Sequence, residues 1–334
     1  MLASFRALGR RTFASSAAPP PASAAKDLSA SKIALYVGAP LALTGALYYY
    51  STESEQSAKL LKMQKLAASN PTPALDNPKE FKPFVLSKIE KLTPTTSRFV
   101  FELPEGTTEL GLPTASCLLT RFDNGVKADG KPDVVIRPYT PIEDPAKGYT
   151  GTFDLVVKKY PNGPMSTHIF NLKRGDTLEM KGPILKYKYE ANKEGHVGLI
   201  AGGTGITPML QIIERALSDP KDETKLSLLF ANVSEEEIIL RDHIDSLAAK
   251  YKERFNVFYT VDKPSAKWTG GSGFINAEML TSVLPKPGQG KVFVCGPGPM
   301  LNHVSGSKAP DYSQGEVGGL LAKLGYSKDD VFKV

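Results

Sequence analysis

Four short motifs hold the residues that could do chemistry in this sequence. They are Arg137-Pro138-Tyr139-Thr140, Gly163-Pro164-Met165-Ser166, Gly202-Gly203-Thr204-Gly205-Ile206-Thr207-Pro208 and Cys295-Gly296-Pro297-Gly298-Pro299-Met300. An arginine can bind a diphosphate through two parallel hydrogen bonds, and a glycine turn before a helix presents backbone N–H groups to phosphate. In this order, the motifs indicate a surface for a flavin diphosphate beside a surface for a pyridine dinucleotide.

The first two motifs suit the flavin. Arg137 offers the diphosphate contact, Tyr139 an apolar ring with a hydroxyl at its edge, and Thr140 a short hydroxyl. Taken alone, the tetrapeptide fits equally a surface arginine beside a core tyrosine. The second motif opens an apolar helical segment, where Ser166 is either a phosphate contact or only the N-cap. Lys158 and Tyr160 precede it, two residues apart, and are expected to face the same ligand.

The third motif follows an apolar strand, VGLIAGG, and resembles a dinucleotide-binding turn with one departure. Gly203 and Gly205 match the Gly-x-Gly-x-x-Gly pattern, but Pro208 stands where the third glycine is expected. We predict that Thr207 caps the following helix and that Pro208 is its first residue, so that the N-terminus still receives a pyrophosphate. A glycine turn that serves only packing is the alternative.

Two further residues refine the prediction for the dinucleotide. Asp262 ends the run NVFYTVD, where a carboxylate can bind an adenosine ribose and repel a 2′-phosphate, which favours NADH over NADPH. Lys263 and Lys267 lie close enough in sequence to weaken that preference. Cys295 has no histidine near it in sequence, so it is interpreted as a small side chain beside the nicotinamide or as a buried core cysteine. We predict no metal site, and a single bridge to Cys117 remains open.

The elements that must position these motifs fall into two classes. Residues 79–187 contain short alternating runs separated by Pro, Gly and Asp, namely FVLSKIEKLT, SRFVFELP, VVIRPYTP, FDLVVKKY and DTLEMKGP. Such runs predict an antiparallel β-barrel. Residues 192–334 alternate apolar strands with amphipathic helices, including EEEIILRDHIDSLAAKY as one helix, which predicts a parallel, doubly wound α/β domain. The chain is therefore expected to have more than one domain.

The N-terminal segments have a different composition. Residues 1–31 are rich in Ser, Ala and basic residues, which is typical of a mitochondrial targeting segment, although a plain disordered tail fits too. Residues 32–50 include 18 consecutive uncharged residues ending in three tyrosines, enough for a transmembrane helix of about 27 Å, with a buried core helix as the alternative. Residues 51–78 are predicted to be a linker.

The charge distribution argues against a nucleic-acid partner. Residues 1–50 contain five basic residues and one acid, so they carry +4 of the net charge of +6. The remainder, with +2, shows no dense basic stripe with interleaved aromatics. We therefore expect no binding of nucleic acid.

With these motifs in place, the chain resembles the NADH-cytochrome b5 reductase family, most closely its fungal mitochondrial members, through RPYT, VVKKY, GPMS, GGTGITP, Asp262 and CGPGPM over about residues 79–334. The resemblance implies that FAD contacts Arg137, Pro138, Tyr139, Thr140, Val156, Lys158, Gly163, Pro164, Met165, Ser166 and Thr207. It implies that NADH contacts Gly202, Gly203, Thr204, Asp262, Phe274, Cys295, Gly296, Pro297 and Met300. Lys158, Thr207 and Cys295 would be the catalytic residues beside the reacting rings.

The resemblance also implies an activity and a location. A hydride would pass from NADH to FAD, and single electrons from FAD to the haem of cytochrome b5 or a similar haem protein. The protein would be anchored in the mitochondrial outer membrane, with a processed form in the intermembrane space. Two alternatives remain: the same flavin chemistry with a quinone or another haem protein as acceptor, or an anchored interaction protein with inactive nucleotide sites.

The sequence departs from the family pattern at three places. Pro164 occupies a position that is often lysine, which removes one phosphate contact. Gly298 replaces a frequent proline, and the chain ends Phe332-Lys333-Val334 where many relatives end in an aromatic residue. Shielding of the flavin by a terminal ring is therefore not expected from the sequence.

Overall fold

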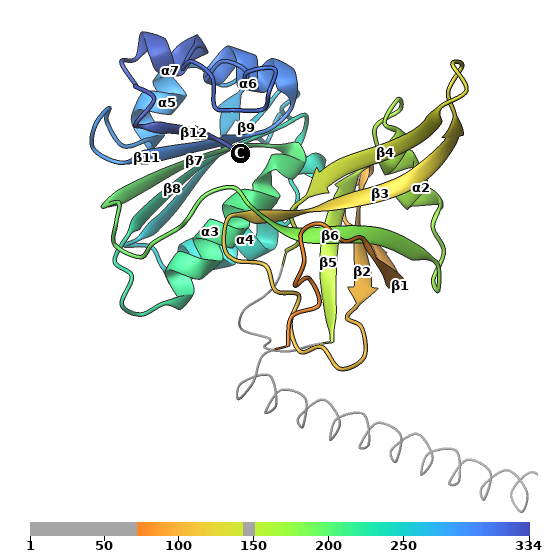
Figure 1. The fold of residues 1–334 in the computed structure, drawn as a ribbon. Coiled ribbons are helices and arrows are strands. Elements are labelled where there is room, and N and C mark those ends of the chain that lie inside the picture. Colours follow the sequence, from red (N-terminus) through yellow and green to blue (C-terminus); the bar gives the residue numbers. More distant parts are fainter. Residues whose placement is uncertain (1–71, 143–150) are drawn as a thin grey trace, which may run out of the picture. The chain divides into compact units, whose positions relative to one another are not determined.

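The computed structural model describes residues 72–142 and 151–334, which form a β lobe (72–142 and 151–187) and an α/β lobe (192–334), both shown in Figure 1. The predicted targeting segment (1–31), the predicted transmembrane helix (32–50) and residues 51–71 of the predicted linker lie outside the described residues. Within the described ranges, no helix has the length and apolar character needed to cross a membrane.

The β lobe is a six-stranded antiparallel sheet. Its strands are β1 (Lys82–Lys91), β2 (Thr96–Glu102), β3 (Ser116–Val126), β4 (Pro132–Tyr139), β5 (Thr152–Lys158) and β6 (Thr177–Leu185), in the order β4-β3-β6-β1-β2-β5. A bridge between Ile142, which follows β4, and Asp154 of β5 joins the two edges of this order. The antiparallel β domain predicted from the alternating runs is therefore present, with β3 as a strand that those runs did not include.

Phenylalanines fill the interior of the β lobe. Alternation along β2 turns Phe99 and Phe101 inward, and Phe153 of β5 packs edge-on to Phe84 and stacks on Phe101, with ring centroids 5.2 and 5.7 Å apart. The helix α2 (Pro164–Asn171) adds Met165 and Ile169 to this core.

The last residues of the predicted linker are part of the β lobe. Ala74 and Leu75 are buried in the same phenylalanine core, and the Lys82 ammonium donates to the Ala74 carbonyl at 3.1 Å. Ala74 and Leu75 therefore tie this Pro-rich stretch to the sheet, whereas residues 76–78 are exposed.

The α/β lobe is built on a six-stranded sheet in the order β10-β9-β8-β7-β11-β12, with every neighbouring pair parallel. Its strands are β7 (His196–Gly202), β8 (Lys225–Asn232), β9 (Phe255–Val261), β10 (Gly271–Ser272), β11 (Lys291–Cys295) and β12 (Val331–Lys333). Its helices are η3 (Gly203–Gly205), α3 (Ile206–Ser218), η4 (Glu235–Glu237), α4 (Arg241–Lys250), α5 (Ala277–Val283), α6 (Gly298–Val304) and α7 (Gly319–Lys323). The predicted parallel α/β architecture is confirmed.

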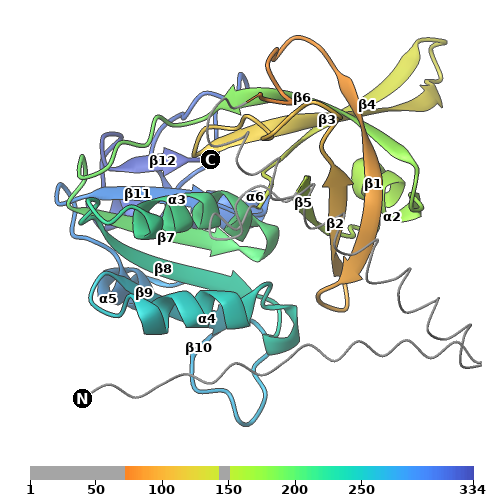
Figure 2. The ribbon, with the colours of Figure 1, turned by 90° about the horizontal axis from the view of Figure 1, so that it is seen from below.

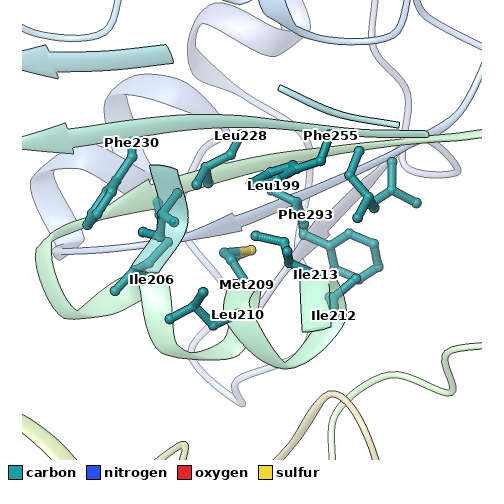
Figure 3. Packing of buried hydrophobic residues seen from close by; sticks show 14 of the residues in the cluster. Leu199, Ile206, Met209, Leu210, Ile212, Ile213, Leu228, Phe230, Phe255 and Phe293 are labelled. Atoms are coloured by element: carbon teal, nitrogen blue, oxygen red, sulfur yellow. The ribbon is translucent and has the colours of Figure 1, made fainter. Parts of the chain in front are cut away.

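Helices cover both faces of this parallel sheet: α3 and α4 lie on the face seen in Figure 2, and α5, α6 and α7 lie on the other face (Figure 1). Leu199 and Leu228 point to α3, where Met209 and Ile213 pack against them (Figure 3), and Ile244 of α4 belongs to the same cluster. The next residue of β7, Ile200, belongs to a second cluster with residues of α5, α6 and α7. The strands are apolar on both faces because both faces are buried.

The core on the α3 side continues into the β lobe. Ala115, which precedes β3, and Val156 of β5 belong to the same buried cluster as Leu199 and Ile206. The two lobes therefore share apolar packing as well as a chain connection.

One predicted helix is interrupted. The segment EEEIILRDHIDSLAAKY forms the single turn η4 and then α4, with Leu240 between them in the left-handed conformation at φ 57°. The helix therefore starts at Arg241, and the three glutamates belong to a separate turn. Leucine seldom adopts this conformation, so the surrounding packing must hold the interruption in place.

Candidate cofactor-binding site

The RPYT motif lies at the end of β4, as predicted. The Arg137 guanidinium is exposed and donates to the carbonyl of Ile136 at 2.7 Å. Tyr139 is half-buried, and its burial, together with the nearby Tyr160, raises its pKa to about 12 against an opposing effect of Arg137. The phenol therefore stays protonated at neutral pH and can donate a hydrogen bond near an exposed guanidinium, while Pro138 and Thr140 complete the strand end.

The GPMS motif forms the start of α2, but Ser166 does not cap it. Gly163 is the N-cap, Pro164 the first helical residue, and the buried Ser166 donates to the Gly163 carbonyl at 3.0 Å and accepts from the Tyr160 amide at 3.2 Å. A Cβ at Gly163 would lie 2.5 Å from the Ser166 oxygen, so only glycine fits this turn. The N-cap alternative for Ser166 is therefore wrong, because the hydroxyl is used two residues inside the helix.

An open pocket of about 380 Å³ lies at this end of α2. It is lined by Phe122, Asn124, Pro161, Asn162, Gly163, Pro164, Thr167, His168 and Asn171. Phe122 and His168 stack face to face with ring centroids 4.1 Å apart, and burial lowers the pKa of His168. The pocket therefore places a flat, uncharged ring pair beside the Gly163-Pro164 turn, which suits stacking of an aromatic ligand ring.

The end of β5 differs from the prediction in one respect. Val156 is buried, and Lys158 is the last residue of the strand, so strand alternation does not extend to Tyr160. The Lys158 ammonium lies 3.2 Å from a carboxylate oxygen of Glu237 in the α/β lobe. Lys158 and Tyr160 therefore do not share a strand face; Lys158 points to the other lobe.

The dinucleotide turn lies where β7 ends, but its helix starts two residues earlier than predicted. Gly203–Gly205 form a 3₁₀ turn, and α3 begins at Ile206 with Gly205 as its N-cap. Thr207 is thus inside the helix and donates to the Thr204 carbonyl at 3.2 Å. Pro208 has no N–H to give to that carbonyl, so the Thr207 hydroxyl takes its place.

The CGPGPM motif packs directly against this turn. A Cβ on Gly202 would lie 2.4 Å from the Met300 sulfur, and one on Gly205 would lie 2.2 Å from the Cys295 carbonyl oxygen. The glycines thus allow the ends of β7 and β11 to approach, and Met300 fills the space between Gly202 and Gly296. Pro297, the N-cap of α6, remains exposed beside them.

Cys295 is partly buried at the end of β11. Burial raises its pKa to about 11, with Lys308 opposing, so it is a neutral thiol and a poor nucleophile. Both cysteines are free, so the bridge to Cys117 left open by the sequence is not formed. Within the described ranges, no group of three or more metal-ligating side chains occurs.

Asp262 follows the last residue of β9, at the same sheet edge as Gly202 and Cys295. Its amide donates to the Asn232 carbonyl, and partial desolvation raises its pKa, with Lys263 opposing. Phe274, predicted to contact NADH, has 75% of its surface exposed. It is therefore free to cover a ligand at this edge.

Two buried polar atoms at the site have no hydrogen-bond partner within the described residues. They are the Thr96 hydroxyl, beside Lys158 in the β2–β5 pairing, and the Asn232 side-chain amide nitrogen, at the end of β8. Buried polar groups normally have partners, so unmatched ones in a binding site indicate a ligand. Together with the Gly163 and Gly202 turns, they fit FAD on the β lobe and NADH on the α/β lobe.

The structure brings the two predicted surfaces together. β5, with Val156 and Lys158, contacts η3, and Gln211 of α3 accepts from the Ser116 amide and donates to the Pro141 carbonyl at 3.3 and 3.2 Å. Thr96, Asn232, Glu237 and Gln211 were not predicted as site residues. None of them belongs to one of the four motifs, and only the folded chain reveals its neighbours.

Comparisons with known proteins agree with this arrangement. Residues 83–189 match a family described as oxidoreductase FAD-binding domain, and residues 199–306 match oxidoreductase NAD-binding domain. The chain is 47% identical over 298 residues to an NADH-cytochrome b5 reductase-like protein of Arabidopsis thaliana, covering 89% of each chain. It is 44% identical over 326 residues to NADH-cytochrome b5 reductase 2 of Coccidioides immitis, covering 97% of this chain and 94% of the relative.

A solved structure is similar as well. The cytochrome b5 reductase domain of Ulva prolifera nitrate reductase superimposes with a TM-score of 0.66 at 34% identity, covering 79% of this chain and 100% of that domain. The two-lobed fold, the motifs at the lobe boundary and near-full-length relatives all agree. The chain belongs to the NADH-cytochrome b5 reductase family.

Proposed function

We propose that the protein is an FAD-dependent oxidoreductase that takes electrons from NADH and delivers them to cytochrome b5. The observation that carries this proposal is the contact between β5 and η3, which brings the flavin-binding strand against the dinucleotide turn. Relatives of nearly the same length are named NADH-cytochrome b5 reductase, which supports the donor and the acceptor. When bound, FAD supplies the chemistry, because it accepts two electrons as a hydride and releases them singly.

The residues of the β lobe would hold the flavin in a fixed orientation. Arg137 and the α2 N-terminus would bind the diphosphate, and Tyr139 and Thr140 would position the ring system. The unmatched Thr96 hydroxyl would hydrogen-bond to the edge of the ring at the lobe boundary. None of these groups needs to transfer a proton, so the protein acts by orientation.

The residues of the α/β lobe would hold NADH against that ring. The turn at Gly202–Gly205 would bind the pyrophosphate, the Asp262 carboxylate the adenosine ribose, and Phe274 would cover the ligand. Cys295, a neutral thiol, would give the nicotinamide a small, soft neighbour. Asp262 would disfavour NADPH because a 2′-phosphate would meet a like charge.

A two-step anaerobic experiment tests this proposal. The full-length protein is mixed with NADH, loss of flavin absorbance is followed, and oxidised cytochrome b5 is then added. We expect the flavin to bleach and the haem to be reduced. If the flavin does not bleach, the hydride step is wrong. If it bleaches and only a quinone or another haem protein is reduced, the acceptor is wrong.

We also propose a location in the mitochondrial outer membrane, with residues 1–31 as targeting segment and residues 32–50 as transmembrane helix. The basic, Ser- and Ala-rich start supports the targeting role. The 18 uncharged residues that follow, which end in three tyrosines, support the transmembrane helix. A processed form lacking this region would lie in the intermembrane space. Alkaline carbonate extraction of isolated mitochondria tests it: the full-length form should stay in the pellet and a shorter form in the supernatant. Release of the full-length form would contradict the anchor.

A further inference from the structure

One buried carboxylate joins the two lobes. Glu237, the last residue of η4, is 8% exposed. Its Oε2 atom accepts hydrogen bonds from the hydroxyls of Thr95 and Thr93 at 2.6 and 3.2 Å and from the ammonium of Lys158 at 3.2 Å. All three donors belong to the β lobe, so a single oxygen of the α/β lobe holds the β1–β2 turn and the end of β5.

The charge of this carboxylate is stabilised by its partners. Burial alone would raise the pKa of Glu237, but the hydrogen bonds from Thr95, Lys158 and Thr93 together lower it below the ordinary value. Glu237 is therefore ionised at neutral pH. A buried ion pair is worth little net stability, because desolvation offsets its attraction, but it requires a defined geometry. The ion pair between Glu237 and Lys158 is thus better suited to orienting the two lobes than to stabilising the fold.

The neighbouring glutamates do not share this arrangement. Glu235 accepts from the amide of Ser265 within its own lobe, and Glu236 is exposed. The left-handed Leu240 ends the segment that carries Glu237, so the buried position depends on a strained interruption rather than on a regular helix. Strain of this kind is retained where the rest of the structure requires the geometry.

Lys158 lies at the point where the two cofactor surfaces meet. Lys158 lies opposite Thr96 in the register of β2 and β5, and the buried Thr96 hydroxyl has no hydrogen-bond partner within the described residues. The strand β5 also contacts the turn Gly203–Gly205. We propose that Glu237 is a positioning residue, which acts through Lys158 to fix the separation and orientation of the flavin and nicotinamide rings. This inference rests on the proposed function, because the two rings are those of FAD and NADH.

The expected consequence is a loss of rate rather than of folding. Hydride transfer needs reacting atoms about 3–3.5 Å apart, and a displacement of about 1 Å can slow a reaction about 100-fold. Without the charge on Glu237, Lys158 has no ionic partner across the boundary. The hydrogen bonds of Gln211 and the shared apolar cluster still join the lobes. The rings would therefore stay near each other but in a less defined geometry.

The test compares Glu237→Gln with the matched control Glu236→Gln in the full-length, FAD-loaded protein. Flavin bleaching by saturating NADH is measured by anaerobic stopped flow, together with the long-wavelength charge-transfer absorbance of stacked flavin and nicotinamide. We expect the Glu237→Gln rate to fall about 10- to 100-fold with a weaker charge-transfer band. The exposed control should stay within about twofold of the unchanged protein. Reduction of cytochrome b5 after chemical reduction of the flavin should not change in either variant.

A double variant distinguishes positioning from a general structural effect. If Glu237 acts through Lys158, adding Glu237→Gln to Lys158→Met should slow bleaching no further than Lys158→Met does alone. Losses that multiply, or an unchanged rate in Glu237→Gln, would overturn the inference. If Glu237→Gln does not fold, Thr95→Val decides: a rate lowered about threefold or more, with FAD retained, supports the inference, and an unchanged rate overturns it. Failure of the unsubstituted protein to bleach would instead contradict the proposed function.

Discussion

Replacing Gly205 by alanine isolates the contact between the dinucleotide turn and the end of β11. Gly205 has φ −61° and ψ −6°, a conformation that alanine adopts readily, so backbone strain plays no part. The added Cβ, however, would lie 2.2 Å from the Cys295 carbonyl oxygen and 2.6 Å from its carbon, where real Cβ atoms essentially never come within 3.0 Å. Both neighbours are backbone atoms at the end of a strand paired on both sides, so no side chain can rotate away.

The expected magnitude follows from this geometry. Overpacking typically destabilises a core by about 1–3 kcal/mol, and rigid backbone neighbours place Gly205→Ala at about 3 kcal/mol. For a chain of this size, that lowers the melting temperature by about 4 °C. The KM for NADH should rise as well, because the shift moves Cys295 and Gly296. FAD content should change little, because Arg137, Tyr139 and the start of α2, which would hold the flavin, all belong to the β lobe.

Urea unfolding and steady-state kinetics measure these effects, and Gly298→Ala is the control. Gly298 lies in the same pair of motifs, but nothing occupies the space within 4 Å of its added Cβ. The control should differ from the unchanged protein by less than about 0.5 kcal/mol. Equal urea midpoints for the two variants would refute the steric reasoning.

Three further predictions concern single positions. Gly298→Pro should stabilise the protein by about 0.5–1 kcal/mol in urea unfolding, because proline fits the first residue of α6; a loss of stability would show that the turn needs the flexibility of glycine. Burial would raise the pKa of Asp330, but hydrogen bonds from Ser327 and the Gly288 amide lower it below 3.8. The ionised Asp330 carboxylate therefore stabilises the fold fully at neutral pH, and this contribution is lost as the pH falls through the lowered pKa. Asp330→Asn should lower the free energy of unfolding in urea by about 1–3 kcal/mol at pH 7 and by less at pH 3. Asp262→Thr should narrow the ratio of kcat/KM for NADH over NADPH, and an unchanged ratio would reject the role given to this carboxylate.

Sequence patterns predicted a strand or helix correctly where its side chains are buried along the whole element. The run VGLIAGG is apolar on both faces because helices cover both faces of the parallel sheet, and its strand was recognised from composition alone. β3 was missed for the opposite reason. Its first half is buried, but Arg121, Asp123 and Asn124 make its second half polar, since the strand extends beyond the core.

Predictions from short sequence patterns were least accurate at the ends of helices. Thr207-Pro208 has the appearance of a cap followed by a first helical residue, yet the 3₁₀ turn at Gly203–Gly205 advances the helix by two residues. The interruption at Leu240 has no glycine or proline to announce it. The pairing of Lys158 with Glu237 joins residues 79 positions apart, so no spacing rule could predict it.

The apolar cluster shared by the two lobes has a thermodynamic consequence. Val156 and Ala115 of the β lobe lie in the same buried cluster as Leu199 and Ile206 of the α/β lobe. Separating the lobes would expose Val156 to water, at about 1.5–3 kcal/mol for that side chain alone. Unfolding of either lobe therefore uncovers apolar surface on the other, which couples the stabilities of the two lobes.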